Sequence, residues 1–278
     1  MNRLTLVPEG GLCNRMYAVT SAVAFAKKHH LRLRVIWFKD WGMGAGFYDL
    51  FNLPPTVENV EIKDAGFVDF FKYAKPIKSN FFIPKLYQKR KFDAVYFWHK
   101  EQLPVEEWYL SHREAHAFYV FHCHKIYDDN AFLNLFSPVD SIQQRIKERT
   151  KAFSPHTTGV HIRRADLTPI IESKSSLPKY IEKMQQEIAL NPETNFYLAS
   201  DSPEEKKNLT DIFGDRIITV ENNLKRDTKE GIVDALVELH ALASTKKILG
   251  SVHSSYSTLA SEIKGIPLEI MGKNEQDY

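Results

Sequence analysis

The chain has 278 residues, enough for one large domain or two of moderate size. Its apolar fraction of 43% and charged fraction of 26% are ordinary for a soluble globular protein. The formal net charge of +2 argues against a nucleic-acid-binding protein, which usually carries a concentrated basic surface. An anion recognised by this chain must therefore be bound by local groups.

The sequence also argues against a secreted protein and against a membrane-spanning one. Residues 1–16 hold no long apolar stretch, so we expect no secretory signal, and no apolar run approaches the roughly 20 residues that span a bilayer. Cys13 and Cys123 are too few for a disulfide framework and are typical of a reducing compartment. These features predict a cytoplasmic protein without a transmembrane segment, for which peripheral contact with a membrane stays open.

The first half of the chain begins as an α/β domain. Residues 3–8 predict a strand, Gly10 and Gly11 a turn, residues 14–26 a helix and residues 31–38 a second strand. After Gly42 the pattern weakens into segments that are rich in aromatic residues but have no clear period. We assign residues 1–135 to an N-terminal α/β domain.

The second half alternates strands with helices. Ser137 and Pro138 are typical of a helix start, and Ser202 with Glu205 predicts a capping box in which Glu205 reaches back to the cap amide. Alternation of this kind indicates crossover connections and a parallel sheet. We therefore expect a doubly wound, Rossmann-like domain over residues 136–278. Its expected elements after the first helix are strands at 157–162, 195–200, 216–220, 246–251 and 266–271, and helices at 177–190, 203 onward, 229–244 and 257–263.

Polar residues follow four consecutive strands of this predicted sheet. In open parallel sheets, ligands bind outside the carboxyl ends of the strands, so these residues predict one binding site. They are His161, Arg163, Arg164 and Asp166 after the first strand, Ser200 and Asp201 after the second, Glu221 and Asn222 after the third, and Ser251, His253, Ser254 and Ser255 after the fourth.

The residue types at this edge suggest that it binds an anion. A guanidinium offers a planar fork of donors that suits phosphate oxygens, and residues 251–258 lead into a helix whose free N–H groups and hydroxyls can hold a phosphate. Asp166 would orient one of the arginines. The alternative is that Arg163 and Arg164 form ordinary salt bridges at a strand end.

The turn before the first helix has two interpretations. Its sequence, GGLCNR, is not the GxGxxG of a dinucleotide fold, and Asp40 lies too far along for a ribose contact, so a nicotinamide site is poorly supported. Gly10 and Gly11 either make a simple tight turn or let a substrate approach the backbone while Asn14 or Arg15 touches it.

Together, four segments resemble the α-1,2/α-1,6/protein-O-fucosyltransferase superfamily, whose members transfer fucose from GDP-fucose. HIRRAD resembles its first motif, FYLASD its second, and the segment from ELHALAS to STLASEI its third region, while GGLCNRM is similar to its N-terminal segment. The match covers the start of the chain and most of it after residue 136. Residues 42–130 show no resemblance.

The resemblance implies a GT-B-like architecture, with two Rossmann-like domains facing a cleft, the N-terminal one on the acceptor side and the C-terminal one holding the donor. It also implies inverting transfer to a glycan acceptor with no metal or cofactor required. Arg163 would contact the β-phosphate of GDP and stabilise the departing diphosphate, assisted by Arg164. The other implied contacts are His161 and Glu238 at the guanine or ribose, Ser254 and Ser255 at phosphate oxygens, and Asn14 at the diphosphate or fucose. Gly11, Asp201 and Ser251 join this donor-binding set from the turn and strand-end positions above.

Two departures leave the linkage open. Leu167 follows Asp166 where some α-1,6 members carry Lys, and the SVHSSYS loop differs from the α-1,2 pattern. No motif fixes a general base, for which Asp166 and Glu172 are candidates. Two other functions are a transferase that uses GDP-mannose or a UDP-sugar, and a non-catalytic nucleotide-sugar-binding protein.

Other chemistry-bearing residues have plainer interpretations. A zinc site is conceivable among five residues, but their spacing is poor and we interpret them as strand or cleft histidines. The basic run 85–92 could face a membrane or a polyanion, although a solvated surface is favoured. Asp234 lies one turn before Glu238 and its role is open. The five residues are His112, His116, His122, Cys123 and His124, and the aromatic residues expected in the core rather than at a sugar are Phe51, Phe70 and Phe71.

Overall fold

A computed structural model describes residues 1–53, 57–127, 135–164 and 174–272. The chain divides into two units, each with its own parallel sheet. Unit 1 comprises Met1–Val139 and Lys225–Val233, and unit 2 comprises Asp140–Leu224 and Asp234–Tyr278. The expected class, α/β with two Rossmann-like domains, is confirmed.

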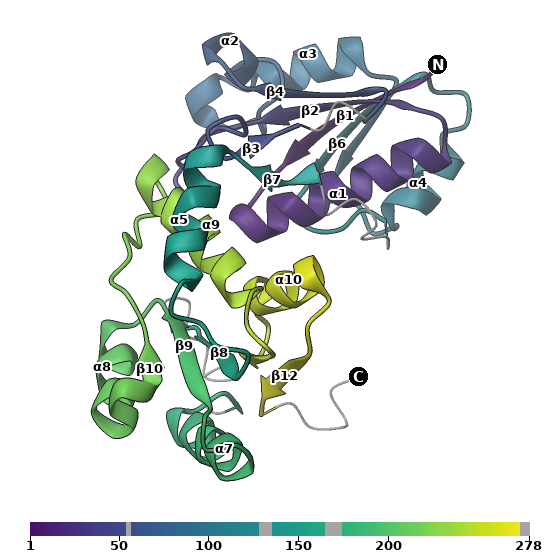
Figure 1. The fold of residues 1–278 in the computed structure, drawn as a ribbon. Coiled ribbons are helices and arrows are strands. Elements are labelled where there is room, and N and C mark those ends of the chain that lie inside the picture. Colours follow the sequence, from purple (N-terminus) through teal and green to yellow (C-terminus); the bar gives the residue numbers. More distant parts are fainter. Residues whose placement is uncertain (54–56, 128–134, 165–173, 273–278) are drawn as a thin grey trace. The chain divides into compact units, whose positions relative to one another are not determined.

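Unit 1 is built on a five-stranded parallel sheet in the order β4-β2-β1-β6-β5. Helices α1 and α4 cover one face of this sheet, and α2 and α3 cover the other (Figure 1). The central strand pairs Leu4 with Leu33 on one side and with Phe118 on the other, and all three side chains are buried. The elements are β1 (Arg3–Pro8), α1 (Leu12–Lys28), β2 (Arg32–Trp37), β3 (Phe51–Asn52), β4 (Val60–Asp64), α2 (Phe67–Phe70), η1 (Lys78–Asn80), α3 (Ile83–Lys91), β5 (Ala94–Phe97), α4 (Val105–Ser111), β6 (Ala117–His122) and β7 (Ser137–Pro138).

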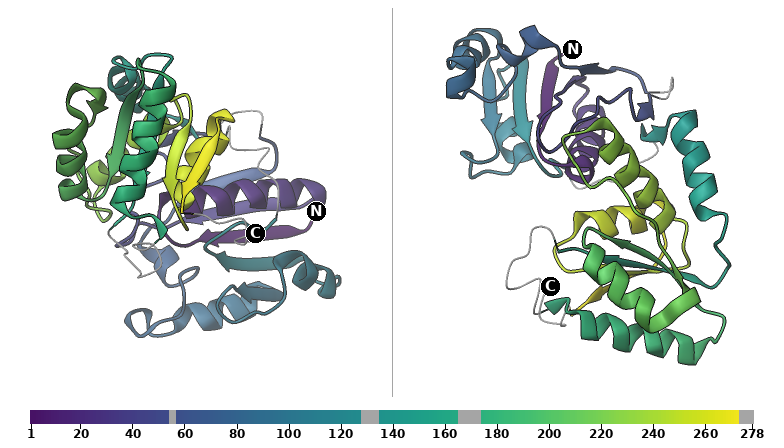
Figure 2. Two further views of the ribbon diagram at one scale, coloured as in Figure 1. Left: turned by 90° about the horizontal axis from the view of Figure 1, so that it is seen from below. Right: turned by 90° about the vertical axis from the view of Figure 1, so that its left-hand side faces the viewer.

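Unit 2 has the sheet order β10-β9-β8-β11-β12, again with every pair parallel. Helices α7 and α8 lie on one side of this sheet, and α9 and α10 lie on the other (Figure 2). Because all five strands run in the same direction, their carboxyl ends meet at one edge. The elements are α5 (Asp140–Thr150), β8 (Thr157–Ile162), α7 (Leu177–Leu190), β9 (Asn195–Ser200), α8 (Pro203–Phe213), η3 (Gly214–Arg216), β10 (Ile217–Ile218), α9 (Lys229–Leu242), β11 (Ile248–Ser251), α10 (Ser255–Lys264) and β12 (Leu268–Met271).

The start of α5 differs from the prediction. Ser137 and Pro138 form the short strand β7, which pairs antiparallel with β3, and the helix begins only at Asp140. The backbone of this segment is used by the sheet, since the N–H of Val139 also donates to the carbonyl of Leu50 over 3.0 Å. Ser137 and Pro138 therefore form a strand and not a helix cap, because they pair with Phe51 and Asn52, about 85 positions earlier.

No helix in the described part of the chain is both long enough and apolar enough to cross a membrane.

Candidate functional site

Arg163 lies at the carboxyl end of β8 and is half-buried. Its backbone N–H donates to Oγ of Ser251 over 3.0 Å, and its Nη1 donates to the carbonyl oxygen of His253 over 3.3 Å. These bonds tie the end of β8 to the turn that precedes α10. They hold the guanidinium beside the N-terminus of that helix.

Arg164 makes hydrogen bonds to other residues of unit 2 through both its side chain and its backbone. Its Nε donates to Oε1 of Glu205 over 2.6 Å, and both side chains are only 13% exposed. Its backbone N–H donates to Oδ1 of Asp201, also over 2.6 Å. The arginine therefore links β8 to α8 as the salt-bridge interpretation expects, and its part in donor binding stays a prediction.

The predicted capping box is only half formed. Oγ of Ser202 accepts from the N–H of Glu205 over 3.3 Å, as expected, but the Glu205 carboxylate pairs with Arg164 and does not return to the cap amide. An ionic hydrogen bond is stronger than one to a neutral amide, which explains this choice. Ser202 N–H is satisfied by Oγ of Ser200 over 3.1 Å.

Ser251, a predicted donor contact, has its side chain behind the edge of the sheet. Its side chain is fully buried, and its Oγ donates to the carbonyl of His161 over 3.2 Å and bonds to the Tyr180 hydroxyl over 2.9 Å. Together with the bond from Arg163, these contacts occupy the hydroxyl. Ser251 thus positions the backbone of Arg163.

His161 is a buried, uncharged group beneath this edge. Its ring stacks on Tyr256 with 5.0 Å between centroids, and Nδ1 lies 3.5 Å from Oγ of Ser254. Burial lowers its pKa to about 4, and the positive charge of Arg163 acts in the same direction, whereas Asp201 opposes it. At neutral pH the imidazole can therefore donate one hydrogen bond and accept another without adding charge.

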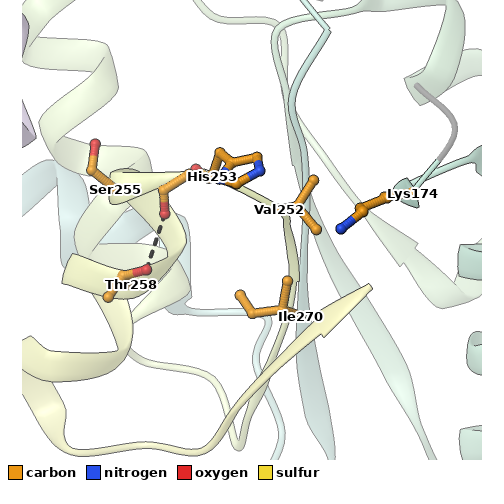
Figure 3. A pocket seen from close by; sticks show the side chains of 7 residues that line it. Lys174, Val252, His253, Ser255, Thr258 and Ile270 are labelled. Atoms are coloured by element: carbon orange, nitrogen blue, oxygen red, sulfur yellow. Dashed lines mark hydrogen bonds between the residues drawn. The ribbon is translucent and has the colours of Figure 1, made fainter. Parts of the chain in front are cut away.

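A pocket of about 470 Å³ opens at the start of α10 (Figure 3). Its polar walls combine an ammonium group, hydroxyls and the free N–H groups of a helix start, a combination that suits an anion. The turn into the helix is sharp, because His253 adopts a φ of 54°. Arg163 is joined to this wall through His253 but is not itself a lining residue. The lining residues are Lys174, Val252, His253, Ser254, Ser255, Thr258 and Ile270.

Glu238 lies on α9 with its carboxylate buried among polar groups. Nδ2 of Asn222 donates to its Oε1 over 2.7 Å, and Nζ of Lys206 lies 4.0 Å from the same oxygen. Burial raises its pKa to about 7 against the opposing effect of Lys206 and Arg149. Such a carboxylate changes its charge in the neutral pH range. Asn222 had been placed at a strand end by its position, but no pattern in the sequence singled out Lys206 or Arg149.

Both carboxylate oxygens of Asp234, on α9, have partners within unit 2. One carboxylate oxygen pairs with Arg145 of α5, and the other accepts the N–H of Asn223 over 2.8 Å. Asp234 therefore fastens α9 to α5 and to the loop that precedes α9.

In unit 1, the two predicted substrate contacts, Asn14 and Arg15, are neighbours in the first turn of α1 but lie in different surroundings. Arg15 is completely buried, with Nε donating to the carbonyl of Gly10 over 2.7 Å and Nη2 paired with Asp40, so it supports the turn and does not face a substrate. Burial lowers its pKa even though Asp40 opposes this. Asn14 is half-buried, and its Oδ1 has no partner among the described residues. Gly11 precedes the helix as its N-cap.

The histidine-rich segment shows local contacts. Nδ1 of His122 bonds to the carbonyl of His124 over 2.8 Å, and Nδ1 of His112 to that of Trp108 over the same distance. Within the described ranges, no three His, Cys, Asp or Glu side chains are grouped to hold a metal ion. Phe51 is buried as expected, while Phe70 and Phe71 are half-buried. Asp166 and Glu172 lie outside the described residues.

Comparison with solved structures supplies the fold. The structure of NodZ α-1,6-fucosyltransferase soaked with GDP-fucose superposes with a TM-score of 0.69 at 17% identity, covering 99% of this chain and 96% of that one. POFUT1 in complex with GDP superposes with a TM-score of 0.62 at 12% identity, covering 98% of each chain. The chain has the fucosyltransferase fold. No family model and no curated protein matches the sequence, so this fold was visible in sequence only through short motifs.

Within the fucosyltransferase fold, the described part of HIRRAD (residues 161–164) lies at the end of β8, FYLASD at the end of β9, and the third region from α9 to α10. They meet at the carboxyl edge of one sheet, as the strand-end rule predicts.

Proposed function

We propose that this protein transfers fucose from GDP-fucose to a glycan acceptor, by an inverting mechanism in which the chain's own side chains act without a metal ion. The observation that carries the proposal is the position of Arg163, whose guanidinium is held beside the N-terminus of α10 in a chain with the fucosyltransferase fold. Two of the structures that share this fold contain GDP-fucose or GDP.

The chemistry follows from where negative charge develops. When the bond between the sugar and the diphosphate breaks, the diphosphate oxygens gain charge, and a fixed guanidinium stabilises that charge at no cost of reorganisation. Ser254 and Ser255, at the start of α10, add hydroxyls and N–H groups for the same phosphates. Asp201 and Arg164 hold the end of β8 in place behind Arg163.

Other residues are assigned to the remaining parts of the substrates. Glu238 and the neutral His161 would accept hydrogen bonds from the nucleoside, for which buried acceptors are suited. Asn14, with Gly11 at the start of α1, would contact the diphosphate or the sugar through its unpartnered Oδ1. Asp166 and Glu172 are the two candidates for the general base.

Calorimetric titration with GDP, GDP-fucose, GDP-mannose and UDP in the presence of EDTA tests the donor. We expect micromolar binding of GDP and GDP-fucose and weak binding of UDP. Equal binding of UDP, or tighter binding of GDP-mannose with turnover, would assign a different donor. GDP binding with neither transfer nor hydrolysis of the donor would identify a binding protein, and no guanine-nucleotide binding would overturn the proposal.

Replacing Arg163 tests the catalytic step. We expect Arg163→Ala to lower kcat by about 10²–10³, because loss of one preorganised donor to a developing charge costs roughly 3–4 kcal/mol. The kcat of Arg163→Lys should lie between those of wild type and Arg163→Ala, since lysine keeps the charge and loses the planar fork of donors. The measurement is the transfer rate at saturating donor, with Arg113→Ala as control, an exposed arginine on unit 1. A rate for Arg163→Ala within a few-fold of wild type would remove Arg163 from the mechanism.

A further inference from the structure

Residues 70–92 of unit 1 form a basic segment that the proposed function does not use. They contain no Asp or Glu. None of the five basic residues from position 78 onward forms an ion pair with an acidic residue of the described chain, and all five are exposed. The basic residues of the segment are Lys72, Lys75, Lys78, Lys85, Lys89, Arg90 and Lys91.

The same segment exposes large apolar side chains. Phe81 is 78% exposed and Leu86 64%. Contiguous exposed apolar side chains rimmed by charge mark interaction sites, whereas isolated ones do not. We call this region the cationic apolar surface: Ile77, Phe81, Phe82, Ile83 and Leu86, with Lys78, Lys85, Lys89, Arg90 and Lys91.

Buried side chains of the same segment anchor the cationic apolar surface to unit 1. Asn80 is fully buried, and its side chain accepts from the N–H of Ile77 over 3.0 Å and donates to the carbonyl of Lys75 over 2.8 Å. Nε2 of Gln88, also buried, donates to the carbonyl of Ala74 over 3.1 Å. Tyr87 packs against the core on the face of the sheet that α2 and α3 cover (Figure 1). The exposed side chains are therefore presented by an ordered scaffold.

The backbone maintains an uncommon conformation to present them. Phe81 and Phe82 are consecutive residues in the left-handed region, with φ of 52° and 55°. Bulky residues rarely adopt it, and such outliers persist where the surroundings enforce them. Here the N–H of Phe82 donates to the carbonyl of Ile77 over 3.2 Å, and its own carbonyl accepts from the N–H of Lys85 over 3.0 Å. In this conformation both aromatic side chains are exposed.

We propose that the cationic apolar surface docks the protein onto the interface of an anionic lipid membrane. Lysines and arginines attract acidic headgroups, and aromatic and aliphatic side chains beside them enter the boundary between headgroups and acyl chains. A single-stranded nucleic acid would use the two aromatic rings as stacking platforms but has no use for Ile77, Ile83 and Leu86. The proposal concerns unit 1 alone and does not depend on the identity of the sugar donor.

Vesicle sedimentation with the full chain tests the proposal. We expect binding to vesicles of phosphatidylcholine mixed with phosphatidylglycerol, little binding to pure phosphatidylcholine, and weakening at high salt. The double variant Phe81→Ser with Phe82→Ser, and the triple variant Lys89→Gln, Arg90→Gln and Lys91→Gln, should each bind at least about tenfold more weakly. The matched controls are Leu190→Ser, which removes an 81% exposed leucine of unit 2, and Lys207→Gln, and both should bind as wild type does.

A second measurement reports insertion directly and does not depend on the serine variants folding. After subtraction of the wild-type emission from the four native tryptophans, Phe81→Trp should give a blue-shifted signal on addition of anionic vesicles, whereas Leu190→Trp should not. Equal vesicle binding by wild type and both surface variants, or no binding at all, would overturn the proposal. So would binding to single-stranded RNA or heparin without vesicle binding, which would assign the surface to a polyanion.

Discussion

At the scale of single residues, the carboxylate of Glu238 has a pKa near 7 because burial penalises its charge. If the ionised form accepts hydrogen bonds from the nucleoside, GDP must bind more tightly as pH rises. We expect the affinity for GDP to increase about tenfold between pH 6 and pH 8, measured by calorimetry. The terminal phosphate of GDP also titrates near pH 6, so wild type alone does not isolate Glu238.

Glu238→Gln supplies the control. It should bind GDP weakly with only the residual pH dependence that the phosphate contributes. A steep profile retained in Glu238→Gln would show that another group is responsible.

Because the folded state holds this proton more tightly than the unfolded chain, Glu238 favours folding below its ordinary pKa of 4.5, and that stabilisation is lost as pH rises through about 7. The Gln variant should therefore gain stability relative to wild type at pH 8 and not at pH 4.

At the scale of elements, the pair of Arg164 and Glu205 fastens α8 to the end of β8. Removing one member leaves the other charge nearly buried and unpaired, so Glu205→Ala should lower the free energy of unfolding by about 3–5 kcal/mol. The double variant Arg164→Met with Glu205→Met should lose less, since no charge is stranded. Far-UV circular dichroism during urea unfolding measures both, because all four tryptophans lie in unit 1 and do not report on α8.

Near-equal loss in the single and double variants would contradict a charge-pairing role. Lys207→Ala is a suitable control, because this residue forms an exposed ion pair with Asp211 on the same helix, worth at most about 1 kcal/mol.

These elements also show what could be read from sequence. Periodicity and caps predicted β8, α7 and β9 at their observed bounds, since each signal is local. The strand-end rule likewise predicts that Arg163 and Asp201 lie at one edge of the sheet. It could not predict that Glu205 binds Arg164, or that Ser251 faces inward, because those choices depend on which partners the tertiary fold brings within hydrogen-bond distance. The helices α3 and α4 were missed because their outward faces are not polar in a regular pattern.

At the scale of the whole molecule, the chain does not divide at a single point. Residues 225–233 follow β10 of unit 2, yet they belong with unit 1 and include the first turn of α9. The N–H of Gly44 donates to the carbonyl of Arg226 over 2.8 Å, and Nζ of Lys229 pairs with Asp49 over 2.6 Å. Sequence patterning predicts where the chain forms elements, but a return of nine residues to the other unit leaves no periodic signal.

Gly44 makes this return sterically feasible. A Cβ at this position would lie 2.3 Å from the carbonyl carbon of Asp227, which is backbone and cannot swing aside. Gly44→Ala should therefore destabilise the docking of residues 225–233, lowering the free energy of unfolding by about 1–3 kcal/mol. Tryptophan fluorescence during urea unfolding is the suitable measurement, since it reports on unit 1.

Gly42→Ala is the matched control, two residues away in the same turn. Its Cβ would meet only the Asp40 carboxylate at 3.5 Å, an ordinary contact, so the free energy of unfolding should stay within about 0.5 kcal/mol of wild type. Equal free energies of unfolding for the two variants would mean that residues 225–233 do not need the close approach at Gly44. A loss confined to Gly44→Ala would instead show that unit 1 is completed by a segment supplied from the second half of the chain.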